Sequence, residues 1–552
     1  GKLDRRALPE PEEVRGGEGE APRPGLEEWV AGVFRDLLGV AEVGRESSFF
    51  ALGGHSLLAT QLQSRLRAEL GRELALATVF EEPTVAGLAS RLVAAGASTA
   101  PPLVRREGQG PLPLSFAQER LWFLAQLEPS SSWYHVPLVA TLRGRLDVAA
   151  WRRALTGLAE RHEGLRTRFP AREGRPEQEI LPPGPVALPV VDLSGLAREA
   201  GEAEGERQLS AAMRRPFDLA AAPPWRALLL RRDAHDHGVC LTLHHVVSDG
   251  WSNGVLIEEL AALYRSASTG EAATLAPLPV QYADFALWQR QWLAGEELER
   301  QLGHWRTELA GLPPLLELAT DRPRPAVLTA AGGFVPLVAE RELASGLAAL
   351  ARSRRGTAFM AWWSAFALLL WRWSGQRDVA VGTPIANRGR REVEGLIGFF
   401  VNTLVMRLAL DPRAGFASLL AQARERSVAA WGHQDLPFEK LVEALAPERS
   451  LSATPLFQVM LTWRNFRAAS LELAGLELVP REVELGLSKF DLTLTLTESG
   501  EGVEGGLTFR QDLWDRSTVE RMAAHLLRLA AGAAAEPERP LSSLPWLSPA
   551  EQ

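Results

Sequence analysis

Cysteine is nearly absent from this chain, since Cys240 is the only one in 552 residues. A lone cysteine excludes an internal disulfide framework and a cysteine-rich zinc site. It fits a reducing compartment, and we therefore expect a cytoplasmic protein. An excess of positive charge is also lacking, because the formal net charge is −8 and no long basic run offsets it. This balance argues against a nucleic-acid partner.

Long apolar runs are missing as well. The most apolar stretch, residues 359–371, is closed by Arg372. It is shorter than the ~20 residues that a membrane span needs, so it predicts a buried helix. The first residues, GKLDRRALPEPEE, contain no apolar segment typical of a signal peptide. We therefore expect no membrane partner.

The chain divides at two stretches that have no apolar periodicity. Residues 10–24 are rich in Glu, Gly and Pro, and residues 96–111 are small, polar and proline-bearing. Both are typical of linkers. Between them lies a segment, 25–95, about half as long as a typical domain, and after them a much longer one begins at 112.

The short segment predicts a bundle of four helices. Apolar residues recur at helical spacing, at Leu26, Val30, Val33 and Leu37 and again at Leu58, Leu62 and Leu66. Thr84 is suited to cap a last helix. A loop containing Gly53 and Gly54 leads to Ser56 at the start of a helix. Such a serine is either an N-cap or an attachment point for a phosphate-linked group, which a helix N-terminus favours.

The long segment predicts a mixed α/β fold. Val239, Leu241 and Leu243 alternate with other residues as in a half-buried strand, and a helical pattern follows at 255–263. Another alternating strand is predicted at 492–496. Strands interleaved with long helices indicate a two-layer architecture.

The predicted strand at 239–243 runs into the sequence LHHVVSDG at 243–250. Because adjacent strand residues point to opposite faces, His245 shares a face with Leu243 if the alternation continues, and His244 lies opposite. A histidine of this pair at a cavity wall either accepts a proton or holds a neutral amine by a hydrogen bond. The pair is otherwise structural in the core or part of a metal site; the metal site is disfavoured because consecutive strand side chains diverge. Asp249 either orients a histidine directly or pairs with an arginine elsewhere. Gly250 permits a close approach of a substrate.

The run FFALGGHSL at 49–57 resembles the attachment motif of peptidyl carrier domains in nonribosomal peptide synthetases. The resemblance implies that Ser56 carries 4′-phosphopantetheine, attached by a phosphopantetheinyl transferase. The opening GKLDR resembles the last motif of an adenylation domain, which implies that residues 1–9 are its C-terminal tail and that an adjacent adenylation domain is a partner.

The long segment resembles condensation domains, the peptide-bond-forming acyltransferases of the same family. Beside LHHVVSDG, an ordered set of motifs carries the likeness: SFAQERLW at 115–122, RHEGLRT at 161–167, YADFALW at 282–288, IGFFVNT at 397–403 and HQDLPFE at 433–439. The resemblance implies two chloramphenicol-acetyltransferase-like lobes, at 112–275 and 276–545, with a tunnel between them. It makes His245 the functional histidine, beside His244, Asp249 and Gly250. Arg166 is the expected partner of Asp249, and Asn402 is expected to line the tunnel.

The expected reaction joins an aminoacyl or peptidyl donor thioester to the amine of an acceptor, with donor and acceptor carrier domains as partners and an antibiotic or siderophore as the product class. The residues of the first motif and of the His-His motif resemble those of condensation domains that accept an L-configured donor. We expect no metal. The alternatives are an epimerisation-type domain, a stand-alone acyltransferase and a non-catalytic platform that only docks carriers. The intact histidine pair disfavours the last of these.

Overall fold

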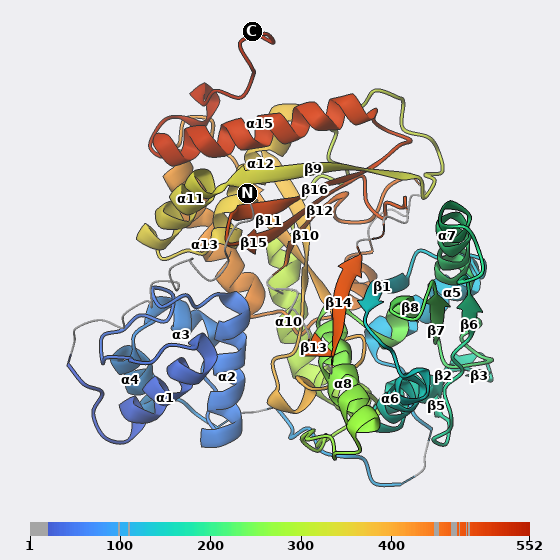
Figure 1. Cartoon of the computed structure of the whole chain (residues 1–552). Coiled ribbons are helices and arrows are strands. Elements are labelled where there is room, and N and C mark those ends of the chain that lie inside the picture. Colours follow the sequence, from blue (N-terminus) through green and yellow to red (C-terminus); the bar gives the residue numbers. More distant parts are fainter. Residues whose placement is uncertain are drawn as a thin grey trace, which may run out of the picture.

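The computed structural model describes residues 20–97, 100–108, 111–446, 452–464, 472–473, 475–481, 483 and 486–552. The expected adenylation tail at 1–9 and most of the 10–24 linker lie outside the described residues. The first described unit is a bundle of four helices, as predicted (Figure 1). Its helices are α1 (Leu26–Leu38), α2 (Ser56–Leu70), α3 (Leu76–Glu81) and α4 (Val85–Ala94).

The residues expected from the sequence to cap these helices do so. Gly39 closes α1 in the left-handed conformation, with φ of 67°. Thr84 caps α4 because its hydroxyl oxygen accepts the amide proton of Gly87 at 3.1 Å. The apolar faces of the helices, including Val30, Leu62 and Leu88, are fully buried in the centre of the bundle.

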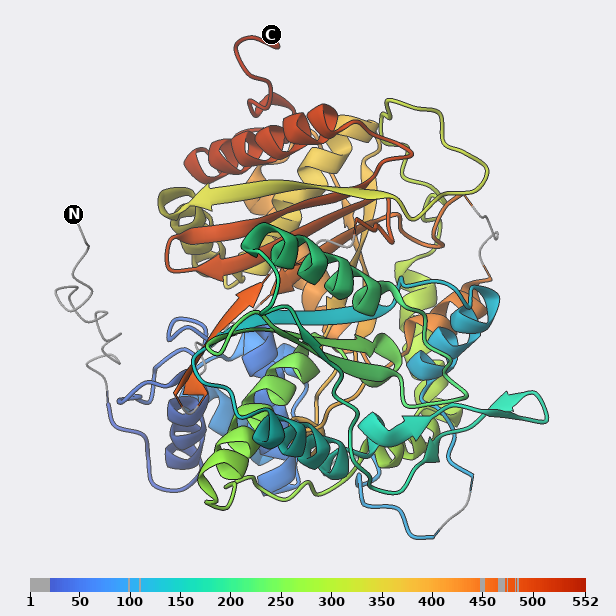
Figure 2. The same cartoon turned by 45° about the vertical axis from the view of Figure 1, so that its right-hand side comes forward.

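The rest of the chain forms two lobes, each built on a six-stranded sheet (Figure 2). The first sheet has the order β13-β14-β1-β8-β7-β6. Its strands are β13 (Glu472–Leu473), β14 (Leu476–Arg481), β1 (His135–Arg143), β8 (Asp236–His244), β7 (Trp225–Arg231) and β6 (Val190–Asp192). Two short pairs lie beside it, β2 (Thr167–Arg168) with β5 (Glu179–Ile180) and β3 (Ala171–Arg172) with β4 (Arg175–Pro176).

The alternation in β8 explains how this sheet is covered. Leu241 and Leu243 share a core with α6 (Val148–Arg161) and α8 (Gly250–Thr269). Cys240 points to the other face and packs with α7 (Arg198–Arg214). Both faces of β8 are therefore buried, so the predicted strand and the helix after it are confirmed, but the prediction that the strand is half-buried is wrong.

The second sheet has the order β11-β10-β12-β15-β16-β9. Its strands are β11 (Asn402–Ala409), β10 (Asp378–Ile385), β12 (Val459–Arg464), β15 (Leu492–Ser499), β16 (Gly502–Arg510) and β9 (Gly332–Glu340). Its helices are α11 (Arg341–Ser353), α12 (Ala358–Ser374), α13 (Phe416–Trp431) and α15 (Arg516–Ala535). Four more helices lie near the junction of the lobes: α5 (Phe116–Leu127), α9 (Tyr282–Trp292), α10 (Gly295–Glu308) and α14 (Phe438–Leu445).

The apolar stretch at 359–371 is a buried helix, as predicted. Every residue of α12 from Phe359 to Trp371 is buried against its neighbours in the second lobe. Within the described part of the chain, no helix combines the length and the apolar character that crossing a membrane requires.

One segment of the expected C-terminal lobe joins the first sheet. β14 pairs antiparallel with β1, with Val139 opposite Arg481, and β13 pairs with β14. The chain then returns to β15 in the second sheet. This crossing brings the residues just before β15 close to the end of β8, where the histidine pair lies.

Candidate active site

The histidine pair lies where β8 ends. His244 is the last residue of β8, and His245 opens the short 3-10 helix η3 (His245–Val247). Asp249 is then the N-cap of α8. The chain leaves the strand after His244, so the alternation of side chains ends there. The sheet therefore does not place His245 on the same face as Leu243.

His244 has the contacts of a buried turn residue. Its Nδ1 accepts the amide proton of Val246 at 3.1 Å. Its ring centroid lies 6.1 Å from that of His135 and 6.2 Å from that of Phe217. Burial holds the pKa of His244 well below its usual range. The ring is therefore neutral and closes the turn rather than facing a cavity.

His245 has a defined tautomer. Its Nδ1 lies 3.0 Å from the carbonyl oxygen of Ser248, and its amide donates to the carbonyl of Tyr134 at 2.7 Å. A carbonyl oxygen only accepts, so Nδ1 carries the proton and Nε2 carries the lone pair. Burial and then the nearby Lys489 lower the pKa of His245 to about 3. At neutral pH the imidazole is uncharged and Nε2 is a hydrogen-bond acceptor.

The ring of His245 lies at the junction of the two lobes. Its centroid is 6.5 Å from that of Tyr134, just before β1, and 5.6 Å from that of Phe399, just before β11. The imidazole is half-buried between these aromatic side chains. Elements from both sheets therefore set its surroundings.

Asp249 holds the two lobes together instead of touching His245. Its Oδ1 accepts from the amide and hydroxyl of Ser252, both at 2.8 Å, and its Oδ2 accepts from the amide of Phe400 at 2.9 Å. Arg388, in the loop after β10, donates to Oδ1 at 3.2 Å. Both side chains of this ion pair are fully buried. Of the two roles open from the sequence, the structure gives Asp249 the pairing with an arginine.

The expected partner of Asp249 was wrong. Arg166 lies 3.6 Å from Glu163 and donates to the carbonyl of Leu181 at 2.5 Å. It is the last residue of the 3-10 helix η2 (Glu163–Arg166) after α6, whereas Asp249 faces the loop after β10 in the other lobe. Arg388 occurs in the polar run ANRGR at 386–390, and nothing in that run distinguishes it from the other arginines.

Gly250 and Asn402 occupy positions that support the site. A Cβ added at Gly250 would meet no described atom within 4 Å, so the folded chain itself leaves room beside this glycine. Asn402 is buried and holds the segment 434–438. Its Nδ2 donates to the carbonyls of Gln434 and Leu436, and its Oδ1 accepts from the amide of Phe438 at 3.0 Å.

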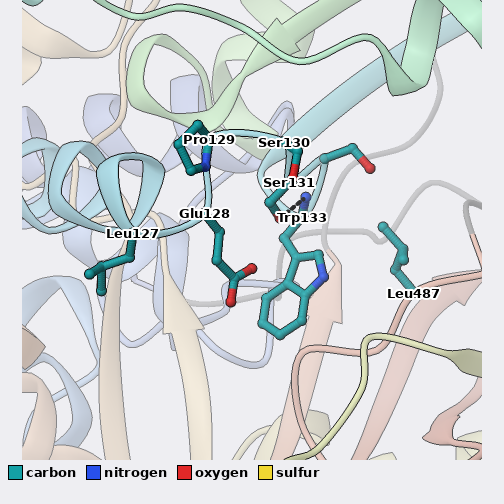
Figure 3. A pocket seen from close by; sticks show the side chains of 8 residues that line it. Leu127, Glu128, Pro129, Ser130, Ser131, Trp133 and Leu487 are labelled. Carbon is teal, nitrogen blue, oxygen red and sulfur yellow. Dashed lines mark hydrogen bonds between the residues drawn. The ribbon is translucent and has the colours of Figure 1, made fainter.

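One cavity is lined by Trp133, next to Tyr134 in the chain, and another by Phe399, an aromatic neighbour of His245. An open pocket of about 450 Å³ lies beside Tyr134, between the end of α5 and the segment before β15 (Figure 3). Its lining residues are Leu127 to Trp133 and Leu487. A smaller cavity is lined by residues of both lobes, among them Phe399, Asn402, Asn387 and Glu439. Asn402 lines this second cavity, and its place in a tunnel between the lobes stays a prediction.

Ser56 is the first residue of α2, a helix of 15 residues. The loop before it is held tightly, because the amide of Gly54 donates to the carbonyl of Phe49 at 2.9 Å and a Cβ at Gly54 would lie 2.4 Å from the Phe49 ring. Gly53 adopts a positive φ of 99°. A serine at the start of a helix fits a phosphate-linked group, since the helix N-terminus favours negative charge. The residues present thus fit 4′-phosphopantetheine.

The helical bundle packs on the second lobe. The ring of Phe80 in α3 stacks on Trp431 at the end of α13, with centroids 5.2 Å apart. Arg424 of α13 donates to the carbonyl of Phe80 at 3.1 Å. Because both rings are buried, the core of the bundle is continuous with that of the lobe.

A second contact joins the bundle to the loop that carries Arg388. Arg67 of α2 donates to the carbonyl of Gly389 at 3.0 Å, and Arg391 lies 3.3 Å from Glu69. The residue before Gly389 is the partner of Asp249. Figure 1 shows the bundle and α5 on opposite sides of the two lobes.

Within the described part of the chain, no group of three or more His, Cys, Asp or Glu side chains is placed to hold a metal ion. The metal alternative for the histidine pair therefore gains no support.

Comparisons with known proteins identify both parts of the chain. A family model described as condensation domain matches residues 108–552, and one described as phosphopantetheine attachment site matches residues 28–92. One component of the linear gramicidin synthase of Brevibacillus parabrevis is 44% identical over 560 residues. The dimodular nonribosomal peptide synthase of Bacillus subtilis (strain 168) is 42% identical over 562 residues. The alignments cover 100% of this chain but 11% and 23% of these relatives.

Solved structures share the fold of the two lobes. The X-domain in complex with OxyB from teicoplanin biosynthesis aligns with a TM-score of 0.75 and 32% identity, covering 82% of this chain and 100% of that one. Holo-AB3403, a four-domain nonribosomal peptide synthetase bound to AMP and glycine, aligns with a TM-score of 0.70 and 24% identity, covering 80% of this chain and 34% of that one. The second likeness concerns the fold alone.

Proposed function

Since the chain belongs to the condensation-domain family of nonribosomal peptide synthetases, with a phosphopantetheine attachment domain in front, we propose that it forms peptide bonds. An acceptor amine attacks the carbonyl carbon of a donor aminoacyl or peptidyl thioester. A C–N bond forms, the C–S bond breaks, and the proton released by the amine ends on the sulfur. The proposal keeps the domain limits indicated by the sequence, 25–95 for the carrier and 112–545 for the two lobes.

The geometry of His245 carries this proposal. Its Nδ1 donates to Ser248, so Nε2 presents a lone pair at the junction of the lobes, where an amine N–H can donate to it. A general base works best when its pKa is near the working pH. Because the pKa of His245 is lowered to about 3, we assign it mainly to holding and orienting the amine. Alignment of two reactants can lower a barrier by about 7–11 kcal/mol, so orientation alone is a large contribution.

Ser56 is the proposed attachment residue of the donor, and α2 and the loop 49–54 are the elements that hold it in place. When bound, the phosphopantetheine group supplies a thiol that carries the donor as a thioester. We further propose that this carrier serves the two lobes in cis from the side where Arg67 contacts Gly389. The acceptor carrier, supplied by another part of the assembly, then approaches the open pocket beside α5 on the opposite side.

A transfer reaction tests the proposal. Ser56 is loaded with an aminoacyl-phosphopantetheine, a separately loaded acceptor carrier is added, and intact-protein mass spectrometry follows both chains. We expect a dipeptidyl mass on the acceptor carrier, and no loading and no dipeptide with Ser56→Ala.

One other function is favoured by a specific observation. The similar X-domain was solved in complex with another protein, OxyB, which supports a platform that docks partners. Loading of Ser56 without transfer, across several donor and acceptor residues, would favour this platform over a condensation enzyme.

The contact between carrier and loop gives a further prediction. Arg67→Ala removes a charged donor from the carbonyl of Gly389, and hydrogen bonds of charged groups contribute about 1.5–3 kcal/mol. We expect transfer from the donor on Ser56 to slow about tenfold, with loading unchanged. Arg35→Ala, which alters an exposed arginine on α1, is the matched control. Equal transfer rates for Arg67→Ala and the control would contradict delivery from this side.

A further inference from the structure

Lys489 lies near His245, since its charge lowers the pKa of that imidazole. It precedes β15, and its carbonyl accepts from the guanidinium of Arg510 at 2.7 Å. The neighbouring Ser488 is tied to the carbonyl of Ala330 through its amide at 2.9 Å. Two residues before Lys489, Leu487 lines the pocket. The backbone at Lys489 is therefore held by the end of β16 and by the segment before β9.

The side chain of Lys489 reaches the other lobe. Its Nζ lies 4.5 Å from the centroid of the Tyr134 ring, which is the range of a cation–π contact. Tyr134 is the residue whose carbonyl accepts the amide proton of His245 and whose ring lies beside the imidazole. The ammonium group of Lys489 and the imidazole of His245 thus both lie beside the Tyr134 ring.

Among the described residues at this site, Lys489 is a cation for which no ion pair is found. Asp249 is paired with Arg388, and Arg120 of α5 is paired with Glu439 at 3.1 Å. In the described part of the chain no carboxylate forms an ion pair with Lys489, and the charged group that acts on it is another cation, Arg120. A half-buried cation that forms no ion pair within the described residues costs stability, and this favours a negative charge that arises during function.

The choice of lysine at position 489 also supports a role for its charge. Of the 60 Lys and Arg residues in the chain, three are lysines, at positions 2, 440 and 489. Arginine therefore serves nearly everywhere else that a positive charge is needed. A compact ammonium group at position 489 concentrates its charge on one atom and occupies less space than a guanidinium.

We propose that the Lys489 ammonium group stabilises the negative oxygen of the tetrahedral adduct formed when the acceptor amine attacks the donor thioester. This inference rests on the condensation reaction proposed above. When the C–N bond forms, the carbonyl electron pair moves to oxygen; when the C–S bond breaks, it returns, and the amine proton ends on sulfur. Lys489 keeps its own proton throughout and acts by its charge, as fixed positive groups do in other acyl transfers.

The charged form of Lys489 is the one that acts, and this sets the sign of the pH dependence. Loss of water around the side chain, and then Arg120, lower its pKa to about 8. The contribution of Lys489 is therefore present below pH 8 and is lost as the pH rises through that value. The other titratable or charged groups around it are Tyr134, His244 and His245 in the first lobe, Glu439 of α14 and Arg510 of β16.

The test is the single-turnover rate of dipeptide formation by the full chain, loaded on Ser56, at saturating acceptor carrier between pH 6.5 and 9.5. We expect the wild-type rate to fall above about pH 8 and Lys489→Arg to remove that fall, because arginine stays charged. Lys489→Met should lose about 10²-fold at pH 7 and show no such fall. Lys440→Met, in α14 where Lys440 pairs with Glu443, is the matched control and should behave as wild type.

The outcomes separate this inference from the proposed function. A wild-type chain that makes dipeptide, with an alkaline fall that persists in Lys489→Arg, overturns the role of Lys489 alone. Dipeptide formation by Lys489→Met at the wild-type rate also overturns the role of Lys489 alone. A wild-type chain that makes no dipeptide with any donor overturns both proposals. If Lys489→Met fails to fold, the pH dependence of wild type and of Lys489→Arg still tests the role of Lys489, because both carry a cation at this position.

Discussion

A chain with alanine in place of His245 should form dipeptide about 10²–10³-fold more slowly, while Ser56 is loaded as before. The substitution removes the one acceptor nitrogen that the turn after β8 presents at the junction of the lobes. It leaves the carrier, the buried ion pair of Asp249 and the loop of Arg388 unchanged. The measurement is the dipeptidyl mass on the acceptor carrier as a function of time.

Two further variants sharpen this result. His245→Gln keeps a hydrogen-bond acceptor near the position of Nε2 but cannot take up a proton. If orientation of the amine is the main contribution, His245→Gln should be clearly faster than His245→Ala. Equal loss in both variants would instead indicate proton transfer. His235→Ala, which alters an exposed histidine before β8, is the control and should leave the rate unchanged.

Asp249→Ala should lower the free energy of unfolding by about 3–5 kcal/mol, because it leaves the guanidinium of Arg388 buried without its partner. The same change removes the cap of α8 and the acceptor of the Phe400 amide. Denaturant unfolding followed by tryptophan fluorescence measures the loss. Dipeptide formation should fall as well, because the turn that carries His245 then loses its ion pair with the second lobe.

A double variant separates the ion pair from the other contacts of Asp249. Asp249→Ala combined with Arg388→Met removes both charges, so the unpaired buried cation is gone and part of the lost stability should return. Glu202→Ala breaks an exposed ion pair with Arg198 in α7 and should cost far less. If Asp249→Ala is no more destabilising than Glu202→Ala, the proposed role of the buried pair is wrong.

The bundle of four helices, the strand before the histidine pair and the helix after it could be predicted from the sequence, because each depends on spacing within a few residues. The alternation at 239–243 and the cap at Thr84 are signals of this kind. The assignment of the chain to nonribosomal peptide synthetases likewise followed from ordered local motifs. Location in the cytoplasm and the domain limits stay predictions.

The partner of Asp249 could not be predicted in this way. Asp249 and Arg388 are 139 residues apart, and Arg166 is an equally plausible arginine as long as only motifs are considered. The choice depends on which loop the second sheet brings to the start of α8. The position of Lys489 beside Tyr134 depends in the same way on the crossing of β13 and β14 into the first sheet.

The sequence by itself determined that a serine begins a helix after a tight glycine loop and that two histidines follow a buried strand, since backbone preferences and side-chain periodicity act locally. Only the tertiary structure decided which histidine faces the junction of the lobes, which arginine neutralises Asp249 and which aromatic ring Lys489 contacts. The physical reason is that burial and charge pairing depend on distances between segments far apart in the chain, and packing of the two sheets sets those distances.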